Sequence, residues 1–206
     1  MSEVEVTTAE LTEVSPAGRA VIASLALHRV SLFPMEGEFS ELFPGSEAFL
    51  QRAVAVSRTL AVSRTLASGE PATDELAEVL EVYNEHVEPD GEHIEEPDGP
   101  GAWGMDVLDI AGYVLEAWDD PDSSAETVAD ALDAMHSFAD ALEEMIPVVR
   151  DGDDPADLRE LEIQRQVADV RAVTARGGMD AAAIDRLYAA SLPLAHAYRE
   201  RIGLLP

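Results

Sequence analysis

The chain has 206 residues, of which 47% are hydrophobic and only 5% are aromatic, and its formal net charge is −29. This hydrophobic fraction is enough for an apolar core, so we expect one helical domain spanning residues 1–206 rather than global disorder. The lack of cysteine excludes disulfides and thiolate metal sites. No apolar run approaches the ~20 residues of a membrane span. The acidic N-terminus lacks the basic start of a signal peptide, so we expect a cytoplasmic protein.

The pattern of caps and breakers predicts an all-α fold: a single-domain bundle of about seven helices, with an acidic loop between the fourth and fifth. Residues 1–14 are expected to form an acidic N-terminal arm. Ser15 and Pro16 are typical of an N-cap and a first-turn proline. Pro193 is expected to kink or interrupt the last helix. Strand candidates are weak and lie only near the N-terminus. The expected helices cover residues 16–33, 46–69, 74–86, 103–118, 124–145, 155–176 and 180–203.

Most of these helices carry one apolar stripe, as expected for elements that bury one face. The clearest stripe runs for five turns in 124–145 and is followed in quality by those of 103–118 and 46–69. The stripe residues are Val128, Leu132, Met135, Phe138, Leu142 and Met145, then Val107, Ile110, Val114 and Trp118, then Phe49, Ala53, Val56 and Leu60.

The acidic charge is concentrated in the middle of the chain. All 13 basic residues are Arg, yet residues 65–149 contain no Arg and 24 Asp and Glu. Such a field repels nucleic-acid phosphates and anionic membranes, so we expect neither as a partner. Clustering of the acids indicates a basic partner or a repelled one. Two alternatives remain: these helices are simply the most solvated, or the whole composition reflects a salt-loving host.

Two short tandem copies occur in the chain. AVSRTL is repeated directly at 55–66, and the phrase Glu-His-(Val/Ile)-Glu…Pro-Asp-Gly is repeated within 85–101. Two such local copies indicate replication slippage rather than a pair of ligand sets. Because each acidic copy ends in a Pro-Asp-Gly turn, residues 87–102 are expected to form a mobile acidic loop.

Candidate metal ligands are few. His86 and His93 could reach one ion across the acidic loop, with Glu88 or Glu95 joining. Asp133, His136 and Asp140 share the helix face opposite the apolar stripe, where the alternative is an exposed histidine between two carboxylates. The EF-hand spacing is absent from the loop.

Other catalytic signals are missing from the sequence. There is no Gly-x-Ser-x-Gly elbow, no phosphate-binding glycine loop, and neither Lys nor Cys to act as a nucleophile. His28 and His196 lie on mainly apolar segments and are expected at core or boundary positions. Trp103 and Trp118 are expected to be packing anchors.

Four stretches together give the chain a family resemblance: LALHRVSLFP, LDIAGYVLEAW with Asp109 and Glu116 seven apart, ETVADALDAMHSFADALEEM, and LRELEIQRQVADV with its Glu162-Ile163-Gln164 step. In these stretches the chain resembles the YjaG-like family of small bacterial helical proteins of unknown function, over nearly its whole length. The resemblance implies a helical fold and transfers no catalytic residue. The acidic stretch 85–101 departs from the family, whose loop is shorter there.

These observations favour a non-enzymatic binding protein without a cofactor, such as an inhibitor or immunity-type protein that covers a basic surface on a partner protein. A homo-oligomer is possible. The alternatives are a metal-dependent enzyme that uses the histidines and carboxylates above, and a housekeeping helical protein of a halophile. The residues expected to bind the partner are Glu85, Glu88, Asp90, Glu92, Glu95, Glu96, Asp98, Asp106, Asp109 and Glu116.

Overall fold

The computed structural model describes residues 5–35, 43–65, 73–87, 100–120, 122, 124–145, 157–175 and 179–203. Within these ranges the chain is all-helical, with eight helices and no strand, which confirms the all-α prediction. The helices are α1 (Thr8–Thr12), α2 (Pro16–Val30), α4 (Ser46–Thr65), α5 (Thr73–Val87), α6 (Pro100–Asp119), α7 (Ser124–Met145), α8 (Leu158–Thr174) and α9 (Ala181–Ile202). None of the helices described is both long and apolar enough to cross a membrane.

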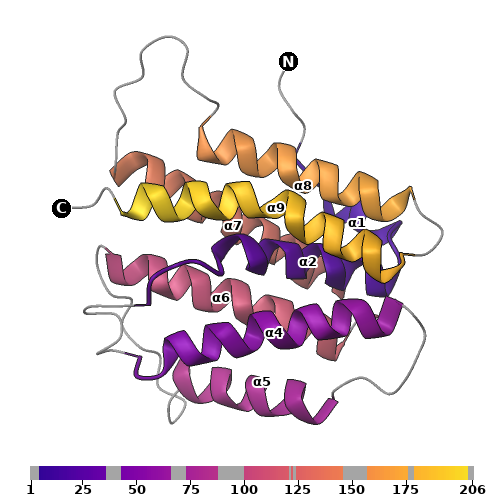
Figure 1. Ribbon diagram of the computed structural model, residues 1–206, viewed down its shortest axis with the longest axis horizontal. Helices are drawn as coiled ribbons and strands as arrows, with labels where there is room; N and C mark the ends of the chain where they lie inside the picture. The colour runs from indigo at the N-terminus through magenta and orange to yellow at the C-terminus, as the bar shows by residue number, and fades with distance from the viewer. Residues whose placement is uncertain are drawn as a thin grey trace.

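Helix α2 lies at the centre of the molecule and contacts α4, α6, α7, α8 and α9 (Figure 1). It begins as the sequence predicts, because the Ser15 side chain accepts a hydrogen bond from the Gly18 amide at 3.2 Å and Pro16 follows it. Twelve of its fifteen residues are buried, among them Arg19 and Arg29. A helix covered on all sides needs no single stripe, and this explains the near-continuous apolar run from Ala20 to Leu27.

The predicted apolar stripes form the core. Val107, Ile110, Val114 and Trp118 of α6 are all fully buried, and α4 and α7 also bury their stripes, in α7 as far as Leu142. Both tryptophans are packing anchors as predicted, with Trp103 3% and Trp118 0% exposed. The Trp118 indole also donates a hydrogen bond to Ser24 Oγ of α2 at 2.8 Å, which fixes α6 against the central helix.

Several predicted details differ from the structure. The helix expected to start near Asp154-Pro155 starts at Leu158, with Asp157 as the N-cap that accepts from the Glu160 amide at 2.7 Å. Helix α9 runs through Pro193 without interruption. His196 is exposed rather than at a core or boundary position.

The segments expected to be an N-terminal arm and a loop fall partly within helices. Residues 1–14 include α1, whose Leu11 is fully buried and whose capping box joins Thr7 and Glu10. Of the expected loop 87–102, Val87 belongs to α5 and residues 100–102 belong to α6. The remaining positions, 88–99, lie outside the described residues.

Candidate protein-docking surface

One side of α6 faces solvent and carries most of its charge. Asp106, Asp109, Tyr113 and Glu116 are half-buried or exposed and are spaced three, four and three residues apart, so they form one stripe. The apolar residues between them point to the core. Helix α7 packs along α6 and adds Asp130 beside this stripe. We call these five residues the acidic surface.

The pKa of Tyr113 reflects the negative charge of the acidic surface. Burial raises the pKa of the Tyr113 phenol, and Asp109, Asp130 and Glu116 raise it further because they oppose a second negative charge. The three carboxylates are therefore close enough to one ring to act on it together, although they come from two helices. Glu116 and Asp130 form no ion pair with any residue that the structure describes. The acidic surface thus keeps a strong local negative potential.

The residues predicted to bind a partner lie in three places. Asp106, Asp109 and Glu116 share the acidic surface, so the structure brings these three together. Glu85 is exposed near the end of α5, a helix that also packs against α6. The other predicted residues, Glu88, Asp90, Glu92, Glu95, Glu96 and Asp98, lie outside the described residues.

The residues predicted as metal ligands on α7 do not share an environment. Asp133 is exposed, whereas His136 is only 6% exposed, which corrects the expectation of an exposed histidine. The shortest approach between them, Nδ1 to Oδ1, is 3.9 Å. The Asp140 carboxylate lies 3.4 Å from Arg159 Nε instead. Among the described residues no group of three His, Asp or Glu could hold a metal. The His86 side chain and His93 are outside them.

His28 is a boundary residue, as predicted. Its ring meets the Tyr188 ring edge-on with centroids 4.9 Å apart, and its Nδ1 has no hydrogen-bond partner in the described part of the protein. Burial lowers the pKa of the imidazole, and the positive charges of Arg58 and Arg29 lower it further. His28 therefore favours the neutral form and shows no geometry of a catalytic base.

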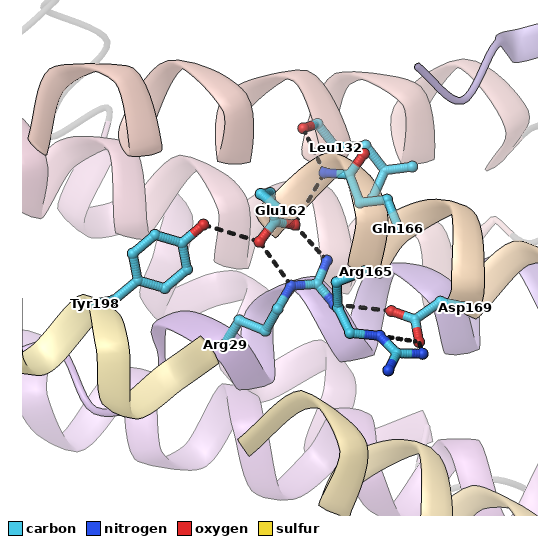
Figure 2. Close-up of polar contacts among 7 residues, drawn as sticks. All are labelled: Arg29, Leu132, Glu162, Arg165, Gln166, Asp169 and Tyr198. Carbon is cyan, nitrogen blue, oxygen red and sulfur yellow. Dashed lines mark hydrogen bonds and ion pairs between the residues drawn. The ribbon is translucent and has the colours of Figure 1, made fainter. Parts of the chain in front are cut away.

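The polar cluster that sequence reasoning missed is a buried ionic network between α2 and α8 (Figure 2). Arg29 Nη2 and Nε donate to the two Glu162 oxygens at 2.6 and 3.0 Å, and Nη1 donates to Asp169 Oδ2 at 2.9 Å. Arg165 adds two bonds to the other Asp169 oxygen, at 2.7 and 3.0 Å. Two guanidinium groups thus balance two carboxylates, and all but the partly exposed Arg165 are in positions where water cannot screen them.

Two neutral groups complete the hydrogen bonding of Glu162. Tyr198 of α9 donates to Oε2 at 2.9 Å, and Gln166 donates to Oε1 at 2.9 Å and to the Leu132 carbonyl of α7 at 3.0 Å (Figure 2). Burial raises the pKa of the Tyr198 phenol well above its ordinary value, and the Glu162 carboxylate raises it further. The phenol therefore stays protonated and donates. The network joins α2, α7, α8 and α9 through one carboxylate.

This network is structural rather than catalytic. The side chains of Arg29 and Glu162 are fully buried and that of Asp169 is 1% exposed, so no substrate can reach these groups. Burial acts to lower the pKa of Arg29, but Glu162 and Asp169 outweigh it and raise that pKa. A signal for the network was present in the sequence, since 158–174 has helix caps but no apolar stripe. Its buried face is Leu158, Glu162, Gln166, Asp169 and Val173.

Comparison of the chain with models of protein families, with curated proteins and with solved structures finds no match in any of the three.

Proposed function

We propose that this protein is a non-enzymatic binding protein whose acidic surface docks on a basic surface of a partner protein, as an inhibitor or immunity-type protein does. The observation that carries the proposal is the convergence of Asp109, Glu116 and Asp130 on Tyr113. Like charges held close together lower the stability of the folded state, so their presence on one surface favours a functional role such as binding. An aromatic ring among carboxylates is also a typical anchor for a protein interface.

Electrostatics gives such a surface two functional properties. Complementary charge raises the rate of diffusional encounter, in favourable cases to about 10⁸–10⁹ M⁻¹s⁻¹ at low salt, and it opposes acidic competitors. An arginine of the partner could pair with Glu116 or Asp130 and stack on Tyr113. We further propose that the chain is one helical domain, in which the acidic segment between α5 and α6 extends the docking surface as a loop.

The experiment is affinity capture from an extract of the source organism at 0.05 M and at 0.5 M salt, followed by direct binding measurements with the identified partner. The test variant is Asp109→Asn/Glu116→Gln/Asp130→Asn. The matched control is Glu13→Gln/Glu47→Gln/Glu144→Gln, which removes the same number of charges from exposed positions outside the acidic surface. We expect the test variant to weaken binding at least about tenfold and the control to leave it within about twofold.

Three outcomes contradict the proposal: no protein is captured at low salt, capture is indifferent to salt, or the control variant weakens binding as much as the test variant. A captured partner without a basic surface contradicts it as well. Circular dichroism spectra of the three proteins establish that the substitutions leave the helices intact.

A further inference from the structure

A groove of about 310 Å³ lies between α8 and α9. Leu161 and Ala168 line it from α8, and Ala190, Pro193 and Ala197 line it from α9, so its walls are mainly apolar. Arg165 also borders the groove, but its guanidinium is held by Asp169 of the buried network. An apolar groove at the surface of a chain with net charge −29 is a place where contact with another protein costs little desolvation.

The segment that forms this groove is neutral, unlike the middle of the chain. Residues 157–203 contain seven Asp and Glu and seven Arg, whereas residues 65–149 contain 24 acids and no Arg. Helices α8 and α9 also lie on the opposite side of the molecule from α5 (Figure 1). Two copies that meet through α8 and α9 would therefore keep their α5 helices apart, although α7 packs directly against α8.

Two exposed charges on α9, in line with the groove, are arranged in a self-complementary way. Helices α8 and α9 run in opposite directions (Figure 1), so Glu160 and Glu200 lie at one end with Arg159 and Arg199, and Arg171 and Arg186 lie at the other with Asp180 and Asp185. Arg186 and Glu200 are both exposed, and the 14-residue separation spans about 21 Å of helix. Pro193 lies midway between them and lines the groove.

These observations point to a second copy of this chain as the occupant of the groove. We propose that the protein forms a two-fold symmetric dimer through α8 and α9. A two-fold axis through the groove near Pro193 places the Arg186 end of α9 in one copy over the Glu200 end of α9 in the other. Arg186 of each copy then faces Glu200 of its partner, and the apolar walls meet between the two ion pairs. An isologous interface requires this kind of self-complementary patch.

Arg186 and Glu200 have no strong ion pair with the described residues of their own copy, so both are available to pair with a second copy. Arg186 is 4.0 Å from Asp180 in a contact where both side chains are more than half exposed, which is a weak pair in water. Arg171 also feels the charge of Glu10 from α1. Glu200 forms no ion pair with a residue that the structure describes. We therefore assign the central role to the contact between Arg186 and Glu200.

The test is analytical ultracentrifugation of the full chain from 1 to 200 µM in 0.15 M NaCl, where a dimer has twice the 22.1 kDa chain mass. We expect a concentration-dependent dimer. Arg186→Glu and Glu200→Arg each turn two attractive contacts into repulsive ones, so each should raise the dimer dissociation constant about tenfold or more. Mixing the two variants restores both contacts and should restore a heterodimer.

The matched control is Arg199→Glu, which makes the same charge change on an exposed position of α9 that points away from the groove. Ala190→Glu places a charge in the apolar centre and should abolish the dimer. A monomer at every concentration would overturn the proposal, whether or not the groove binds an apolar dye. Equal effects of Arg199→Glu and Arg186→Glu, or no rescue in the mixture, would overturn the proposed arrangement. The acidic-surface variants should dimerise normally.

Discussion

Replacing Arg29 by Met tests how far the fold depends on its buried ionic network. Arg29 makes three of the hydrogen bonds in the network and is fully buried, and Met fills a similar length without the charge. After the change, Glu162 retains only neutral donors, and Asp169 retains Arg165. The network then holds two carboxylates against one guanidinium in a place that water cannot reach.

Removing one partner of a buried ion pair typically costs about 3–5 kcal/mol, because the remaining charge is left without compensation. We expect a loss in this range for Arg29→Met, which is a large part of the about 5–15 kcal/mol that stabilises an ordinary domain. Urea unfolding followed by circular dichroism, at a fixed 0.5 M NaCl, measures the difference. The control Arg199→Met removes an exposed arginine and should cost less than about 1 kcal/mol.

A second variant separates loss of charge balance from loss of packing. In Arg29→Met/Glu162→Gln the remaining pair of Asp169 and Arg165 is again neutral, so the double variant should be more stable than Arg29→Met alone. Strictly additive losses would mean that the two side chains do not interact. If Arg29→Met lowered the stability by less than about 1 kcal/mol, the reasoning would be refuted, because so small a loss is typical of an arginine exposed to water.

Two further outcomes follow from individual contacts. Burial lowers the pKa of His28 in the folded protein, so the unfolded chain binds the proton more tightly, and stability should fall as pH drops from about 6.5 through the lowered folded pKa. This loss of stability should be smaller in His28→Asn. Equal pH profiles of the two proteins in thermal unfolding would contradict the assignment. Trp118→Phe removes the hydrogen bond to Ser24 and part of a buried ring, so we expect the free energy of unfolding to fall by about 2–4 kcal/mol in urea. The double variant Trp118→Phe/Ser24→Ala should lose less stability than the two single variants together. Full additivity would argue against the hydrogen bond.

Sequence reasoning predicted the helices that bury apolar stripes. The stripes of α6 and α7 identify these helices because hydrophobic residues at helical spacing need a core to cover them. Helix α2 does not show a single apolar stripe, because other helices surround it and nearly all of its residues are buried. Pro193 was expected to kink or interrupt α9, and the helix continues through it, because a proline inside a helix removes only one backbone hydrogen bond.

The partners in the buried network could not be predicted from local pattern. Arg29 and Glu162 are 133 residues apart in the chain, so the missing apolar stripe of 158–174 indicates a buried polar face without identifying its partner on α2. The acidic surface was partly predictable, because the excess of acids in 65–149 identified Asp109 and Glu116. Asp130 was not included, because its approach to Tyr113 depends on how α7 packs along α6. Tertiary contacts thus supply what periodicity cannot.

The placement of the arginines links the fold to the proposed docking surface. Arg29 and Arg165 are used to balance buried carboxylates, and most of the other arginines on α8 and α9 make that side of the protein neutral. Adaptation to salt alone would spread acids over every exposed face. Here acids dominate α5 and α6, whereas acids and arginines balance on α8 and α9, so screening by salt should act on the α5–α6 side far more than on the α8–α9 side. This asymmetry favours a docking surface over a uniform solvation layer as the reason for the charge.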